Sequence, residues 1–177
     1  EKDKLSKKNI YAVTKKLNED TAELYSKLDG INFIGLRFFT IFGEWGRPDM
    51  LIFKIFKSHI KNKIIKINNF GNHYRDFTYI GDAVNIIDKL VKKKITGHHI
   101  FNICSNNPIN VLDLIRDFKT KYNLKIKYIS QHKADVLNTH GSNSKIKKYL
   151  KIKSFTNFYK AFDKTYNWYI KNKIYNI

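Results

Sequence analysis

Short apolar runs alternate along this chain with stretches in which apolar side chains recur every three or four residues. Between residues 11 and 28 the apolar positions follow helical spacing, and Asp29-Gly30 comes next as a turn. Residues 31–39 form a largely apolar run with β-branched and aromatic side chains, which is typical of a buried parallel strand. The alternation continues toward the C-terminus and predicts an α/β architecture.

The later elements follow from the same periodicities. Further helices are predicted over 48–62, 83–93, 110–122, 143–150 and 155–172, and further strands over 64–67, 76–80, 99–103 and 125–129. Asp82 and Ser154 are the expected N-terminal caps of the helices over 83–93 and 155–172, because short polar side chains accept hydrogen bonds from the first free N–H groups of a helix.

Composition narrows the class of protein. The 177 residues are 42% hydrophobic and 15% aromatic, which indicates a globular chain. No apolar run approaches the roughly 20 residues that span a bilayer, and the charged start EKDKLSKKN is unlike a signal peptide. A single cysteine, Cys104, cannot form an internal disulfide, so we expect a cytoplasmic protein without membrane contact.

The formal charge of +19 raises the question of a nucleic-acid partner. The basic residues are spread along the chain and nearly all are Lys, so a compositional bias explains them better and no nucleic-acid partner is expected. Three of the four arginines, Arg37, Arg47 and Arg75, stand inside short motifs. Their planar forks suit carboxylates and phosphates.

Tyr11 and Lys15 form the most informative pair in the chain. Four residues apart, they share one face of the first predicted helix. A neighbouring ammonium favours the phenolate form of Tyr and lowers its pKa. A phenol tuned in this way can take a proton from a substrate hydroxyl near neutral pH.

The segments NIYAVTKKLNE, LRFFTIFGEWGRPDM and RDFTYIGDAV, in this order, resemble the C-terminal part of extended short-chain dehydrogenases/reductases. Within them the resemblance is to the NAD-dependent epimerase/dehydratase family, and most of all to the nucleotide-sugar epimerases that act on UDP-glucuronate at C4. The resemblance implies that Tyr11 is the catalytic base. It also implies that Lys15 tunes Tyr11 and, with it, contacts the NAD cofactor at the nicotinamide ribose.

The resemblance also assigns the substrate contacts. Thr40 and Arg47 would face the sugar carboxylate, and Arg75 the UDP pyrophosphate. The alternatives are that Arg47 only pins a loop and that Arg75 forms a salt bridge with Asp76 or another acid. Asp135 resembles a turn that closes over the nucleotide. Arg37 is expected to support a loop rather than to contact a ligand.

A partial Rossmann-like, doubly wound sheet that lacks its N-terminal strands is the implied fold, with a small C-terminal α/β substrate-binding region. Residues 1–47 and 82–104 would belong to the dinucleotide-binding domain, and 48–81 and 105–177 to the substrate-binding region. None of the eight glycines forms a G-x-G-x-x-G motif. We expect that motif upstream of Glu1, and we expect the 177 residues alone to be inactive.

Some positions depart from the resembled pattern. Cys104 replaces a turn glycine, which would cost strain if that position needs a positive φ, and Ala134 and Ser142 replace a Gly and an Asp near the nucleotide turn. Adjacent His98 and His99 point to opposite faces of a strand, so no metal site is expected.

Several alternatives stay open at this point. A UDP-sugar decarboxylase or a nucleotide-hexose dehydratase shares the motifs, and a non-catalytic module that binds a nucleotide sugar or a partner fits the absent Gly-rich turn. The resembled enzymes pair through the Tyr-x-x-x-Lys helix, so a homodimer through residues 11–28 is a further expectation.

Overall fold

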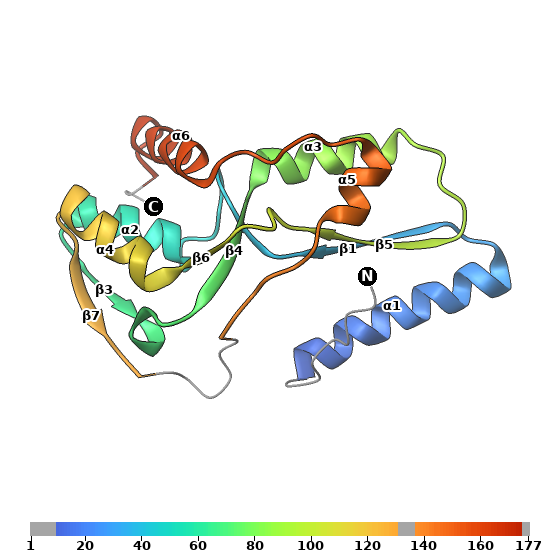
Figure 1. The fold of residues 1–177 in the computed structure, drawn as a ribbon, viewed down its shortest axis with the longest axis horizontal. Coiled ribbons are helices and arrows are strands. Elements are labelled where there is room, and N and C mark those ends of the chain that lie inside the picture. Colours follow the sequence, from blue (N-terminus) through green and yellow to red (C-terminus); the bar gives the residue numbers. More distant parts are fainter. Residues whose placement is uncertain (1–9, 131–136, 175–177) are drawn as a thin grey trace.

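The computed structural model describes residues 10–130 and 137–174, which form an elongated α/β molecule (Figure 1). In these residues the strands pair as three small sheets, with orders β1-β5, β2-β4-β6 and β3-β7. All pairings are parallel except that of β4 with β6. The α/β architecture predicted from the alternation of strands and helices is therefore confirmed.

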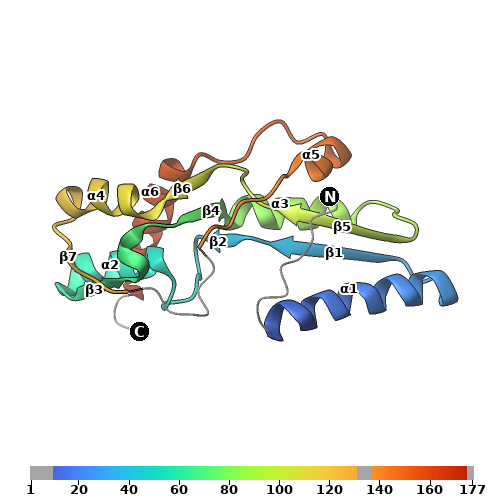
Figure 2. The ribbon, with the colours of Figure 1, turned by 60° about the horizontal axis from the view of Figure 1, so that its bottom comes forward.

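The first sheet pairs β1 (Phe33–Phe38) with β5 (His98–Ile103) in parallel along their whole lengths. Helix α1 (Ile10–Asp29) lies against one face of this pair, and α3 (Ile80–Val91) and α5 (Ser144–Leu150) lie on the other side (Figure 2). A buried apolar cluster fills the space under α3 and α5, made of Ala83, Ile86, Leu90, Ile95, Phe101, Ile103 and Ile146.

The chain leaves the first sheet at Phe39 and enters the second. β2 (Thr40–Phe42) pairs with β4 (Tyr74–Tyr79), which in turn pairs with β6 (Pro108–Asn110). The ring of Phe39 packs so closely on Gly141 that an added Cβ there would stand 2.2 Å from Cζ. Only glycine fits at Gly141 without displacing that ring.

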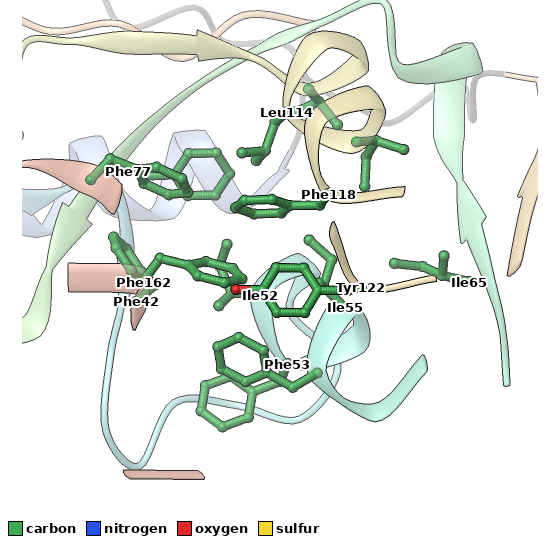
Figure 3. Close-up of a cluster of buried hydrophobic side chains, with 14 of the residues drawn as sticks. Phe42, Ile52, Phe53, Ile55, Ile65, Phe77, Leu114, Phe118, Tyr122 and Phe162 are labelled. Atoms are coloured by element: carbon green, nitrogen blue, oxygen red, sulfur yellow. The ribbon is translucent and has the colours of Figure 1, made fainter. Parts of the chain in front are cut away.

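The third sheet joins β3 (Ile64–Ile67) to β7 (Lys125–Tyr128), and the short 3-10 turn η1 (Asn68–Gly71) follows β3. Helices α2 (Leu51–Lys61) and α4 (Val111–Lys121) lie beside this sheet and its turn, and α6 (Phe158–Lys171) contacts α2 and β4. Their facing sides carry the apolar stripes that their periodicity predicts. A second buried cluster, rich in aromatic rings, joins these helices to β2, β3 and β4 (Figure 3).

The cluster in Figure 3 has Phe118 and Phe162 at its centre, with ring centroids 4.3 Å apart. Phe56 makes an edge contact with Phe162 from α2, at 5.0 Å. Such tilted and edge contacts add to the free energy gained from burying each ring. Helices α2, α4 and α6 are thereby held as one unit on the β2–β4 side of the molecule.

Several predicted boundaries were wrong, for local reasons. The run predicted as one strand over 31–39 is divided at Phe39 into β1 and β2, which belong to different sheets. Helix α3 begins at Ile80, so Asp82 is not its cap and instead accepts hydrogen bonds from the backbone N and Oγ1 of Thr156. Helix α6 begins at Phe158, and Asn157 rather than Ser154 caps it. Helix α3 thus has no side-chain cap, and the α6 cap is the residue directly before the helix.

The apolar pattern of α1 suggests that its large apolar side chains face the sheet, but in the structure they face outward. No residue of α1 is buried. Small or polar side chains form the partly buried inner face, at Ala12, Lys16, Glu19, Ala22 and Ser26. The larger apolar side chains are exposed, at Ile10, Val13, Leu17, Leu24 and Leu28.

Candidate functional site

A cavity of about 350 Å³ opens between β2, β4, the start of α2, and η1. Its walls mix apolar side chains with charged and amide groups, as small-molecule sites do. The lining residues are Thr40, Ile41, Phe42, Asp49, Met50, Leu51, Ile52, Lys54, Lys66, Ile67, Asn68, Asn69, His73, Arg75, Phe77, Val111 and Leu137.

Thr40 and Arg75 are brought together by strand pairing. Thr40 begins β2 and stands opposite Phe77 of β4, two residues from Arg75. The Nη1 atom of Arg75 donates hydrogen bonds of 2.8 Å to the backbone oxygens of Tyr74 and Leu137. These bonds fix the guanidinium at the cavity wall, where it can meet an anion.

Asp76, considered as an alternative partner of Arg75, is completely buried and forms hydrogen bonds with a different segment. Its carboxylate accepts hydrogen bonds from the backbone N and the Oγ of Ser105 and from the backbone N of Asn106, at 2.6–3.1 Å. It thereby fixes the turn between β5 and β6. The turn holds its positive φ at Asn106 rather than at Cys104, so the strain considered for Cys104 does not arise.

Arg47 stands beside the cavity rather than in its wall. Its Nε and Nη2 atoms donate to the two carboxylate oxygens of Asp49, at 3.0 and 2.6 Å. Asp49 lines the cavity, whereas Arg47 is not among the lining residues. The hydrogen bonds from Arg47 lower the pKa of Asp49, and the pair raises the pKa of Arg47.

Two neighbouring residues, Glu44 and Trp45, anchor the loop that carries Arg47. The hydroxyl of Tyr79 donates to the carboxylate of Glu44, 2.9 Å from each oxygen, and Lys164 of α6 lies over the Tyr79 ring. Burial raises the pKa of Tyr79. Trp45 stacks edge-on against Trp168, with centroids 5.2 Å apart. These contacts tie the loop to β4 and α6, so the backbone before Arg47 is well fixed.

Tyr11 and Lys15 lie in the first two turns of α1, as the spacing predicted. The Lys15 Nζ is 5.4 Å from the centre of the Tyr11 ring. Tyr11 is 69% exposed, and neither residue lines the cavity. The structure therefore brings Thr40, Arg75 and Asp49, the partner of Arg47, to the wall of one cavity. Tyr11 and Lys15 are not part of that wall.

Helix α1 is joined to the sheet by Arg37, whose Nε and Nη2 donate to the Glu19 carboxylate at 2.7 and 2.8 Å. Both side chains are largely buried, at 19% and 16% exposure. Arg37 therefore holds the Tyr–Lys helix in place. Asp135 lies outside the described residues.

Sequence reasoning missed Asp49, Lys54 and Lys66, which add charge to the cavity wall. A signal for Lys66 was available, since strict alternation in β3 buries Ile65 and Ile67 and turns Lys66 to the other face. Lys54 and Asp49 could not be found in this way, because a loop and a helix start meet the cavity only through the tertiary fold.

Residues 10–130 and 137–174 contain no group of three or more His, Cys, Asp and Glu side chains placed to hold a metal ion. No described helix combines the length and apolar character required to cross a bilayer.

Comparison with known proteins adds the family. Residues 1–104 match the model of the NAD dependent epimerase/dehydratase family. The chain is 39% identical over 168 residues to the uncharacterized protein MJ1055 of Methanocaldococcus jannaschii, covering 93% of this chain and 51% of that protein. It is 36% identical over 165 residues to a UDP-glucuronate 4-epimerase of Thermodesulfobacterium geofontis, covering 92% and 50%. The chain thus spans about half the length of these relatives.

Solved structures agree with the fold prediction. A UDP-glucuronic acid 4-epimerase of Bacillus cereus, in complex with UDP-glucuronic acid and NAD, superposes with a TM-score of 0.81 at 27% identity, over 92% of this chain and 52% of that one. The dTDP-glucose 4,6-dehydratase DesIV of Streptomyces venezuelae superposes at 0.83 and 17% identity over 93% and 52%, which supports the fold alone. The partial Rossmann-like fold is confirmed, and the chain belongs to the NAD dependent epimerase/dehydratase family.

Proposed function

We propose that this chain supplies the Tyr/Lys helix and the substrate-binding part of an NAD-dependent nucleotide-sugar 4-epimerase that interconverts UDP-glucuronate and UDP-galacturonate. The observation that carries the proposal is the cavity in which Thr40 and Arg75 meet beside the Arg47–Asp49 pair. It stands in a chain 36% identical to a UDP-glucuronate 4-epimerase. Identity to that relative supports the choice of sugar, and the cavity supports binding of an anionic ligand.

Tyr11 is the proton-transfer group in this proposal. Its phenol oxygen takes the proton of the sugar O4 and later returns it, while the ammonium of Lys15 favours the phenolate. NAD, when bound, supplies the hydride acceptor and donor. Both side chains are exposed on α1 and so are open to a ribose and a sugar. The 177 residues contain no Gly-rich cradle for the cofactor phosphates, so Tyr11 and Lys15 would hold only its nicotinamide ribose.

The substrate contacts are divided between residues of this cavity and the adjoining loop. Arg75, fixed by two backbone carbonyls, would bind the pyrophosphate, and Thr40 and Arg47 would bind the sugar carboxylate. Asp135 would close over the nucleotide. The division into a dinucleotide-binding part (1–47 and 82–104) and a substrate-binding part (48–81 and 105–177) remains a proposal. The two separate apolar clusters support it, with two exceptions: α5 packs into the cluster of the first part, and Phe42 belongs to the cluster of the second.

The test is turnover by the natural polypeptide that carries these residues, with conversion of UDP-glucuronate followed by chromatography. Tyr11→Phe is expected to lower turnover by at least about 100-fold, because it removes the proton acceptor, and to leave UDP-glucuronate binding nearly unchanged. Tyr25→Phe, on the same helix and also exposed, is the matched control and should turn over normally.

The outcomes separate the competing functions. Retained turnover in Tyr11→Phe would remove Tyr11 from the proton-transfer role. Loss of CO2 from the substrate would indicate a decarboxylase, and binding without any turnover would indicate a non-catalytic nucleotide-sugar module. Steeply salt-dependent DNA binding with no UDP-sugar binding would indicate a nucleic-acid partner.

A further inference from the structure

The Arg47–Asp49 pair has the chemistry of the substrate contact that the proposed function assigns to Arg47. A carboxylate of the chain itself is bound side-on, both oxygens engaged, by Nε and Nη2 of the guanidinium. This is the two-point geometry in which Arg best binds a free carboxylate. The acid group of a glucuronate sugar would make the same contact.

The position of the pair matters as much as its chemistry. Asp49 and Thr40 both line the cavity, and Arg47 is not a lining residue. The Nε and Nη2 atoms of Arg47 are both engaged by the carboxylate of this lining residue. For the side-on edge of Arg47 to meet a ligand in the cavity, the pair must open.

Opening the pair is easy. The two side chains are 75% and 59% exposed, and ion pairs exposed to this degree are weak. A second cation is also at hand, because Lys54 in the first turn of α2 lines the same cavity and its charge acts on Asp49. The charge of Lys54 thus continues to stabilise the Asp49 carboxylate when Arg47 leaves it.

We infer that Asp49 is a built-in competitor for the acidic group of the substrate, and that Arg47 passes from Asp49 to the sugar carboxylate when an acidic nucleotide sugar binds. This inference rests on the proposed function. A neutral sugar leaves the Arg47–Asp49 pair closed. Asp49 thereby sets how strongly the site prefers acidic over neutral nucleotide sugars, and it keeps Arg47 from binding unrelated carboxylates.

Binding titrations on the natural polypeptide, with UDP-glucuronate and with UDP-glucose as ligands, test the inference. Asp49→Asn keeps the size of the side chain and removes its charge. It is expected to tighten UDP-glucuronate binding by about two- to fivefold, the range that a weak exposed ion pair allows, and to leave UDP-glucose binding unchanged. In an Arg47→Ala background the gain should disappear, because Asp49 acts through Arg47.

Asp88→Asn is the matched control, since it also removes an exposed carboxylate from an ion pair, with Lys92 of the α3 C-terminal end. It should change neither affinity. Weaker UDP-glucuronate binding in Asp49→Asn would overturn the inference and show that Asp49 holds Arg47 ready for the ligand. An equal gain for both sugars would overturn it as well, as a general effect of removing negative charge.

Failure of the proposed function gives a different pattern. If Arg47→Ala leaves the preference for UDP-glucuronate over UDP-glucose unchanged, Arg47 does not bind the sugar carboxylate, and the inference falls with that part of the proposal. If Arg47→Ala removes the preference while Asp49→Asn changes nothing, the carboxylate contact stands and only the competition is disproved.

Discussion

The buried carboxylate of Asp76 shows how a single residue can fix a segment near the site. It accepts three hydrogen bonds from Ser105 and Asn106, and it follows Arg75 directly in β4. We predict that Asp76→Asn lowers the free energy of unfolding by about 1–3 kcal/mol, because the new amide NH2 takes the place of one carboxylate oxygen and cannot accept a hydrogen bond. In one orientation the N–H of Asn106 loses its acceptor, and in the other the N–H of Ser105 keeps only Thr78 Oγ1. Urea unfolding of the natural polypeptide measures the change.

Asp163→Asn is the control for this prediction, because it removes a carboxylate that is 57% exposed and pairs only loosely with Lys121, at 3.5 Å. It should shift the free energy of unfolding by less than about 0.5 kcal/mol. An Asp76→Asn variant as stable as the control would mean that the turn at 105–106 is held by other contacts.

Residue-level prediction from the sequence succeeded where local spacing decides and was wrong where distant partners decide. The Tyr11–Lys15 spacing needs only a helix, and both residues lie on one. The helix cap expected at Asp82 depended on where the chain near Thr156 would run, 74 residues away, and no local pattern reports that. Arg47 was expected to contact a ligand directly, but its guanidinium binds Asp49, two residues later in the chain. The GRPDM motif alone did not indicate this ion pair.

Helix α1 differs from the other described helices because none of its residues is buried. Its large apolar side chains recur at helical spacing on an exposed face, with Leu17 at 63% and Leu24 at 54% exposure. Such a stripe is typical of a surface that packs against another helix. We therefore expect the natural polypeptide to form a homodimer through α1.

Changing Leu17 and Leu24 together to Glu should shift the protein from dimer to monomer in sedimentation velocity, because burying two carboxylates at an apolar interface is costly. Val84→Glu places a charge on a comparably exposed apolar residue of α3, at 55%, and should leave the dimer intact. A double variant that stays dimeric at micromolar concentration would exclude α1 as the interface.

Element boundaries illustrate a second limit of sequence patterns. The run over 31–39 reads as one strand because its apolar residues are continuous, yet it supplies β1 to one sheet and β2 to another. The break at Phe39 is set by partners more than 35 residues away, since β1 pairs with β5 and β2 with β4. Strand partners are chosen by the tertiary fold, so a continuous apolar run could not show the division.

At the scale of the whole molecule, the aromatic core makes stability sensitive to alkaline pH. Burial raises the pKa values of Tyr79, Tyr166 and Tyr169 above the usual 10.0. The folded state therefore holds phenol protons that the unfolded state loses, so the stabilisation is fully present below pH 10 and is lost as pH rises further. Each such group can steepen the fall by up to about 1.4 kcal/mol per pH unit.

Tyr169→Phe is expected to make that fall shallower above the usual pKa of 10.0, because Tyr169 is buried and its phenol is then absent from the titration. Urea unfolding at a series of pH values measures the slope. Tyr25→Phe, which changes a half-exposed ring on α1, should follow the wild-type curve. A Tyr169→Phe curve that also matches the wild type would show that the alkaline loss comes from other groups.

The sequence by itself determined the α/β class, the order of most helices and strands, the Tyr11–Lys15 helix and the family resemblance, because spacing and apolar periodicity are local properties of the chain. Only the tertiary structure decided which strands pair, which face of α1 is open, and that Thr40, Arg75, Asp49 and Lys54 line one cavity. These features depend on contacts between residues far apart in the chain. The free energy of such a contact depends on both partners, so the pattern of one segment cannot predict it.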